Sequence, residues 1–282
     1  METGRITVSR ELFQSPLIPL AAGLSLVGAV CGLAAVAQLF APEAVGALVK
    51  DLYLGGISEG SAVATWRFIH IALTVIGFAW SAVLAGCLVA ICRNRPGQGL
   101  LMLSTASEWT LYGLRGSGVL ILVYLIYRIV RYVIASLAIN EWAYLLYAML
   151  VSEAFMIFLA AMLFAFLCRF CNSLADTAAA LARAVTGGTV GSGCIHWMTP
   201  SGFLLMGILN LVMAADRLFT VTIDQKAVRY VLLVAEHPLL ILSGILFGCG
   251  AAVCFLLASY LFRKKRRFER LLFQKSSRPG NF

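Results

Sequence analysis

The feature that most constrains this 282-residue chain is a series of long apolar runs separated by short polar segments. A helix of about 20 apolar residues crosses the hydrocarbon core of a bilayer, so each long run predicts a membrane-spanning helix. Only 12% of the residues are charged, about half the share of an average globular protein. We therefore expect an all-α, polytopic integral membrane protein with six spans, at Leu17–Phe40, Phe68–Cys92, Val119–Asn140, Trp142–Leu167, Ser201–Leu218 and Leu239–Phe262.

Two of the connecting segments mix apolar and polar residues and predict short amphipathic helices on the membrane surface, at Gly99–Arg115 and Asp224–Glu236. The first apolar run is longer than the ~7–15 residues of a signal peptide's core, so we interpret it as an uncleaved span. No domain boundary is visible inside the apolar region. We expect one transmembrane domain at 1–262, followed by a basic tail at 263–282.

The distribution of Lys and Arg predicts the orientation of the chain. With both termini in the cytoplasm, roughly three times as many Lys and Arg residues fall inside as outside, which agrees with the positive-inside rule. Much of the net charge of +9 comes from one run directly after the last span, so we expect it to contact anionic lipid headgroups rather than nucleic acid. This run consists of Arg263, Lys264, Lys265, Arg266 and Arg267.

The third and fourth spans carry ionisable residues, which are costly in a bilayer and therefore indicate a functional site. Arg128 and Arg131 lie in the third span and Glu153 lies in the fourth. The turn at Asn140–Glu141 is so short that the two spans should form an antiparallel hairpin. Arg128 and Glu153 are equally far from this turn, roughly 19 Å along each helix, which predicts a buried ion pair near the middle of the bilayer.

Helical spacing places further polar residues beside this pair. Tyr124 lies one turn from Arg128 on the same stripe, with Tyr127 alongside, and Asn210 of the fifth span is a possible neighbour. Three interpretations stay open. The pair locks two helices together, it lines a polar pathway or ligand site, or the third span runs from Leu111 to Tyr127 and its arginines reach the interface.

The cysteines give only a weak metal signal. Cys168 and Cys171 form a C-x-x-C sequence, with Cys194 and His196 further along the chain. A zinc site would need a second spaced pair of ligands, so we expect no metal or other cofactor. Signatures of serine hydrolases, P-loops and dinucleotide-binding folds are absent from the sequence, and we predict no catalytic residue.

These observations allow three classes of function. The first is a small transporter or permease-type subunit that uses Arg128 and Glu153. The second is a non-catalytic structural or accessory protein that assembles with a partner membrane protein or with itself. An intramembrane enzyme is the third, with the cysteines and His196 as its only candidate site. The spans contain Gly28-x-x-x-Gly32 and Gly244-x-x-x-Gly248, which favour close packing within the bundle. The sequence has no Asn-x-Ser/Thr acceptor, which is compatible with a bacterial cytoplasmic membrane.

Overall fold

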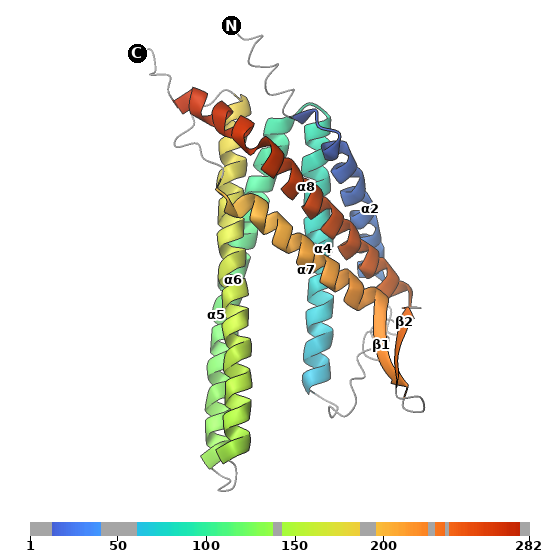
Figure 1. The fold of residues 1–282 in the computed structure, drawn as a ribbon, viewed down its shortest axis with the longest axis vertical. Coiled ribbons are helices and arrows are strands. Elements are labelled where there is room, and N and C mark those ends of the chain that lie inside the picture. The colour runs from blue at the N-terminus through green and yellow to red at the C-terminus, as the bar shows by residue number, and fades with distance from the viewer. Residues whose placement is uncertain are drawn as a thin grey trace.

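The computed structural model describes residues 13–40, 61–137, 143–186, 196–224, 229–234 and 237–276 (Figure 1). This part of the chain is helical apart from one two-stranded hairpin. Its elements in chain order are α2 (Leu17–Gln38), α4 (Ser61–Cys92), α5 (Pro96–Leu137), α6 (Ala143–Thr186), α7 (Met198–Leu218), β1 (Phe219–Asp224), β2 (Arg229–Val234) and α8 (Pro238–Ser276).

Five helical segments in the described residues are long and apolar enough to cross a membrane, which indicates an integral membrane protein. They lie in α2, α4, α6, α7 and α8. Their bounds are Leu17–Gln38, His70–Cys92, Ile157–Thr186, Met198–Leu218 and Pro238–Glu269. The predicted first, second, fifth and sixth spans therefore correspond to helices of the fold. Their ends agree to within about three residues, except that the sixth segment continues to Glu269, past the predicted end at Phe262.

Glycines allow the helices of the bundle to approach closely. A Cβ atom on Gly28 would lie 2.7 Å from Ser81 Oγ of α4, and one on Gly32 would lie 3.0 Å from Phe78 Cβ. Leu246 of α8 contacts the same two positions. The predicted role of Gly28-x-x-x-Gly32 in packing within the chain is confirmed, because both glycines face neighbouring helices of the bundle.

Helices α7 and α8 form an antiparallel pair that crosses the bundle diagonally (Figure 1). Gly207 of α7 packs against the ring of Phe255, and Gly244 of α8 packs against Leu218. At Gly248, in contrast, a Cβ atom would have no neighbour within 4 Å. Only the first glycine of Gly244-x-x-x-Gly248 therefore makes a close contact.

Helices α5 and α6 are much longer than a bilayer is thick. They contain 42 and 44 residues, or roughly 63 and 66 Å at ~1.5 Å per residue. They lie side by side and antiparallel, as two contacts show: Gly118 faces the ring of Phe164, and Ser104 Oγ donates a 3.1 Å hydrogen bond to the carbonyl of Ala175. Their far ends extend past the other helices and the β1–β2 hairpin (Figure 1).

The continuous α5 corrects one prediction. Residues Gly99–Arg115 are the first half of α5, not a separate helix on the membrane surface. A Cβ atom on Gly99 would lie 2.5 Å from the carbonyl oxygen of Cys87, so this half packs along the apolar part of α4. The segment is amphipathic because one of its faces packs in the bundle, which hydropathy alone does not distinguish from a face lying on lipid.

A second prediction is also wrong. Residues 219–234 form an antiparallel hairpin in which Phe219 pairs with Val234 and Asp224 pairs with Arg229, where the sequence predicted an amphipathic helix. Both strands are rich in β-branched and aromatic residues, which favour extended backbone. The predicted interfacial helix overlooked this preference. The loop at 41–60, a further possible place for such a helix, lies outside the described residues.

Different elements meet at the two ends of the bundle. At one end the start of α2 meets the end of α8, where the rings of Phe13 and Phe268 are 5.9 Å apart. The α4–α5 turn and the end of α6 lie there as well, because Asn94 and Val185 line one crevice with Phe13. The opposite end joins α2 to the start of α8 through an apolar cluster of Ala35 and Leu239.

Candidate functional site

The predicted charged pair lies on α5 and α6, in the part that extends past the bundle. The side chains of Tyr124, Tyr127, Arg128, Arg131 and Glu153 are outside the described side chains, so their predicted contacts stay predictions. The backbones of these residues belong to α5 and α6.

We define the distal arm as residues 117–137 of α5 and 143–165 of α6. Its outer surface is apolar wherever the structure describes side chains. On α5 the described exposed side chains beyond Gly118 are Val119, Val123, Ile126 and Val130. On α6 they include Phe155, Phe158, Leu159, Met162 and Leu163.

The base of the distal arm is marked by charge. Arg115 of α5 and Arg169 of α6 are exposed, and the α5–α6 register places them about one helical turn apart in height. Continuing the α4–α5 register from the contact of Gly99 with Cys87 brings residue 116 opposite His70, and α4 continues past this level to Ser61. The apolar segment Ile157–Thr186 of α6 also includes the inner part of the distal arm.

Alongside α4 the outer face of α5 mixes polar and apolar side chains: Glu108 and Arg115 are exposed there, and so are Leu101, Trp109 and Tyr112. Farther along the helix the described exposed side chains, from Val119 to Val130, are all apolar.

Sequence reasoning missed a buried arginine at the end of the bundle opposite the basic tail. Arg217, in the last turn of α7, is 2% exposed, and its Nη2 donates a 3.3 Å hydrogen bond to the carbonyl of His70 in α4. Its Nε has no hydrogen-bond partner among the described residues. The C-terminal end of a helix stabilises a cation. Arg217 therefore connects α4 to α7, and its place next to Asp216 at a predicted span end concealed its burial.

Asn210 of α7 does not point to the distal arm. Its Nδ2 donates a 2.8 Å hydrogen bond to the carbonyl of Met206 in the same helix. Its Oδ1 lies 3.2 Å from the position of a Cβ atom on Gly250, so the amide packs against α8. The described contacts thus place Asn210 between α7 and α8.

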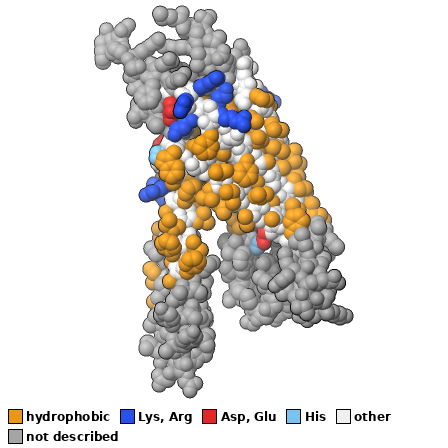
Figure 2. Space-filling model, viewed as in Figure 1, with side chains coloured by type: hydrophobic (Ala, Val, Ile, Leu, Met, Phe, Trp, Pro, Cys, Tyr) orange, Lys and Arg blue, Asp and Glu red, His pale blue; other side chains and the backbone are white. Residues whose placement is uncertain are grey.

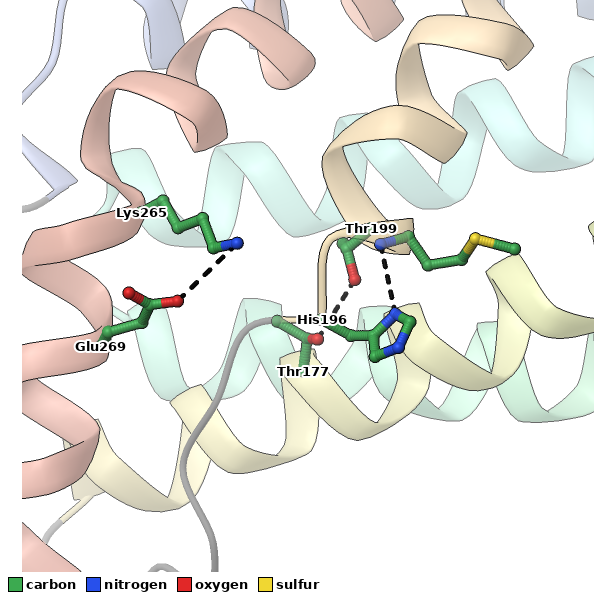
Figure 3. Close-up of polar contacts among 6 residues, drawn as sticks. Thr177, His196, Thr199, Lys265 and Glu269 are labelled. Carbon is green, nitrogen blue, oxygen red and sulfur yellow. Dashed lines mark hydrogen bonds and ion pairs between the residues drawn. The ribbon is translucent and has the colours of Figure 1, made fainter.

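Three buried hydroxyl groups join α6 to α7, and Figure 3 draws the contact between Thr177 and Thr199. Thr199 Oγ1 lies 2.8 Å from Ser173 Oγ and 3.2 Å from Thr177 Oγ1. The cluster borders an apolar cavity of about 80 Å³, well below the ~300 Å³ of a small-molecule site. These hydroxyls therefore satisfy one another and stabilise the contact between the helices. Single Ser and Thr residues in apolar runs were the only sign of them in the sequence.

The candidate metal ligands that the structure describes do not come together in one site. Cys171 is buried in the α6 packing surface, and Cys168 is half-buried on the same helix. The exposed His196 caps α7, because its Nδ1 accepts a 3.2 Å hydrogen bond from the Met198 backbone (Figure 3). Cys194 lies outside the described residues. Among the residues that the structure describes, no three Cys, His, Asp or Glu side chains are grouped to hold a metal ion.

The basic run continues α8 beyond its apolar part, and its side chains are exposed or half-buried. Figure 2 shows Lys and Arg side chains gathered at this end of the molecule. Lys265 Nζ lies 3.9 Å from Glu269 Oε1 one turn away, a contact drawn in Figure 3. A crevice of about 520 Å³, lined by residues such as Phe13, Pro19, Ile91 and Asn94, opens at the same end.

Comparison with known proteins adds no relative to this picture: no family model, no curated protein and no solved structure matches the chain.

Proposed function

We propose that this chain is a non-catalytic subunit of a membrane protein assembly. In this proposal the helical bundle holds the chain in the bilayer, and the outer face of α5 together with the distal arm binds another polypeptide. The observation that carries the proposal is the length of α5 and α6, roughly 63 and 66 Å, which a hydrocarbon core of about 30 Å does not enclose, together with the exposed apolar side chains near their far ends.

Neither lipid nor water suits the whole of this face. Beside the bundle, lipid would have to accommodate the exposed Glu108 and Arg115, and charged groups in hydrocarbon are costly. Past the end of the apolar segment Ile157–Thr186, water would have to cover Ile126, Val130 and Phe155, and large exposed apolar patches mark interaction sites. A protein partner satisfies both levels, because it can offer polar groups at one and apolar groups at the other.

A single bilayer does not contain both levels. The hydrocarbon core is about 30 Å thick, whereas α5 is roughly 63 Å long. If the five apolar spans set the position of the bilayer, residues 143–156 of α6 and the part of α5 beside them lie outside it, because the span in α6 begins at Ile157. We further infer six crossings, with the third made by residues 96–115 of α5 instead of Val119–Asn140. The start of α2 and the end of α8 lie at the same end of the bundle, which supports an even number of crossings.

The test is photo-crosslinking of the full chain in its native membrane. A photoreactive phenylalanine at Val119, 63% exposed on the arm, is expected to form an adduct with another polypeptide. The matched control is Val30 of α2, which is 68% exposed on the bundle and should face lipid. Equal yields of protein adducts at both positions, or none at either, would contradict the proposal.

A transporter or permease-type subunit is the second candidate, and the register of α5 and α6 supports it. Extending the register from the Gly118–Phe164 contact brings residue 128 level with residue 153, as an Arg128–Glu153 pair requires. The same register carries the pair past the bundle, so a pathway through the bundle would not contain it. For this reason we rank transport second.

The transport candidate predicts that Arg128→Gln and Glu153→Gln abolish uptake of radiolabelled amino acids or dicarboxylates into proteoliposomes. The protein should still fold and insert, as judged by its elution from a sizing column. Arg115→Gln, at the base of the arm, is the control and should retain uptake. If the wild-type protein moves none of these solutes, or if the variants fail only by unfolding, the transport role is wrong.

We also infer that the basic end of the bundle faces the cytoplasm and contacts anionic lipid. Arg93, Arg95 and Arg183 belong to the same end as the basic run of α8, which supports this orientation. Labelling of Cys92, which is exposed at this end, by a membrane-impermeant maleimide tests it. Labelling is expected in inverted vesicles and not in intact cells, and the Cys92→Ser variant identifies the labelled residue. A bacterial cytoplasmic membrane remains part of the proposal.

A further inference from the structure

We propose that the crevice at the basic end of the bundle binds the phosphate headgroup of one anionic phospholipid, whose acyl chains lie along the exposed apolar face of α2. This inference rests on the lipid contact proposed above for the basic end, to which it gives a defined site. It does not depend on the assembly role of α5 and α6.

The first step is that the crevice is large enough for a ligand. Its volume is about 520 Å³, within the ~300–1,000 Å³ of small-molecule sites. Its wall comes from the start of α2, the end of α4, the turn that leads to α5 and the end of α6. Residues from these parts include Pro16, Cys92, Asn94 and Val185. Because these parts are distant in sequence, only the folded bundle forms the crevice.

The second step is that the crevice lies at the level of lipid headgroups. The apolar segment of α2 begins at Leu17, that of α4 ends at Cys92, and that of α6 ends at Thr186. Each of these three residues either lines the crevice or directly follows a residue that does. The polar boundary of the bilayer lies where apolar spans end, so a lipid beside the bundle places its phosphate at this height.

The third step is that the surroundings of the crevice are positive. Arg93 and Arg95 flank the lining residue Asn94, Arg183 lies two positions before Val185, and all three arginines are exposed. None of the described residues that line the crevice is acidic. The N-terminal ends of α2 and α5 meet here without an acidic residue in their first turns, and they add partial positive charge. The site therefore favours a phosphate anion and offers no carboxylate to the ammonium group of a zwitterionic headgroup.

The fourth step is that an apolar path for the acyl chains starts at the crevice. Pro19 lines the crevice, and the exposed face of α2 continues from it at helical spacing through Gly23, Leu26, Val30 and Leu33. This face covers roughly 20 Å without a polar side chain. The apolar cavity inside the bundle, at about 80 Å³, is too small for an acyl chain, so the chains lie outside.

The test uses the full chain, purified in detergent and stripped of lipid. After equal amounts of phosphatidylglycerol and phosphatidylcholine are added, native mass spectrometry should find one retained phosphatidylglycerol on the 30.4 kDa polypeptide and little phosphatidylcholine. The double variant Arg93→Gln/Arg95→Gln should lower this retention roughly tenfold, because two charges near the headgroup are lost. Arg115→Gln, which removes a charge far along α5 from the crevice, is the control and should retain the lipid.

A chemical block tests the site in protein that is already folded. Cys92 lines the crevice and is exposed, so a bulky maleimide on its sulfur should prevent retention of phosphatidylglycerol. The Cys92→Ser variant should retain the lipid with or without the reagent. This variant shows that the loss comes from modification of Cys92 and not of another cysteine.

Several results would overturn the crevice as the site. Retention that survives both the Cys92 adduct and Arg93→Gln/Arg95→Gln, but not Arg263→Gln/Arg266→Gln, would place the lipid on the surface of α8 and leave the proposed lipid contact intact. Equal retention of the two lipids would contradict the role of charge. Displacement by the same concentration of glycerol 3-phosphate would identify a free phosphate ester as the ligand. If the wild-type protein retains no phosphatidylglycerol and also fails to bind its vesicles, the lipid contact itself is wrong.

Discussion

The bundle and the distal arm are made of similar helices, yet they bury their side chains differently. In the bundle, glycines such as Gly28 and Gly99 bring helices close, and large residues such as Leu246 are almost fully enclosed. The bundle helices also expose large apolar residues, such as Val30 of α2, but none of the described side chains of the distal arm, which include Ile126 and Phe158, is buried. The contrast shows that apolar composition does not say whether a helix is already packed in the protomer or still presents a face to a partner.

The largest difference should appear when equivalent aliphatic side chains are truncated in the two regions. Leu246→Ala, at a position 2% exposed between three bundle helices, is expected to cost about 2–5 kcal/mol because it leaves a cavity. Ile126→Ala, at a position 54% exposed on the arm, should cost well under about 1 kcal/mol in the dissociated protomer. Unfolding by SDS in mixed micelles, followed by circular dichroism, measures both. Equal costs would mean that the arm is packed within the protomer.

Substituting valine for two different glycines of α5 should produce a smaller difference in stability. Gly99→Val is expected to cost about 1–3 kcal/mol, because the carbonyl oxygen of Cys87 lies 2.5 Å from the new Cβ and backbone yields little. Gly113→Val is the matched control, with no atom within 4 Å of its Cβ position, and should not destabilise the protomer. Melting temperatures in detergent provide the comparison. A destabilised Gly113→Val variant would show that α5 packs differently from this description.

The hydroxyl cluster predicts an effect of intermediate size. Thr199→Val keeps the shape of the side chain and removes the oxygen that contacts Ser173 Oγ and Thr177 Oγ1. Because buried hydroxyls then lose a partner, the variant should be about 1–2 kcal/mol less stable. Thr105→Val, at an exposed position of α5, is the control in the same SDS titration. If the two valine variants are equally stable, the cluster does not hold α6 to α7.

The smallest effect is expected at the basic end. Lys265→Gln removes an ion pair of 3.9 Å between partly exposed side chains, which should change stability by less than about 0.5 kcal/mol. The same substitution should weaken binding to vesicles of phosphatidylglycerol more than to vesicles of phosphatidylcholine, because only the former attract the charge. A cost above about 1 kcal/mol would give this pair a structural role that its exposure does not indicate.

Much of the fold could be predicted from the sequence because hydropathy acts residue by residue. The helices at Leu17–Gln38, Met198–Leu218 and Pro238–Ser276 begin within a few residues of the predicted spans. The segments at Gly99–Arg115 and Asp224–Glu236 were predicted wrongly for different reasons. The first depends on a neighbouring helix that covers one of its faces, and the second on β-propensity that competes with an amphipathic pattern.

The sequence predicts that Arg128 and Glu153 lie at the same depth, but it does not predict which other helices surround them. A short turn between two helices determines which residues are level, so the predicted Arg128–Glu153 pairing follows from chain geometry alone. Whether such a pair lies in a bundle depends on where the other helices end. The burial of Arg217 depends in the same way on the contact between α4 and α7. The hydrogen bond from Arg217 to His70 joins residues that are 147 positions apart in the sequence.

The sequence by itself determined that this chain enters a membrane, where its main apolar helices lie, and which end carries the positive charge. These properties are sums over neighbouring residues. Only the tertiary structure decided that α5 is one long helix, that its first half packs along α4, and that α5 and α6 together extend past the other helices. Those properties depend on which residues, distant in sequence, are brought to the same height, and only packing determines that.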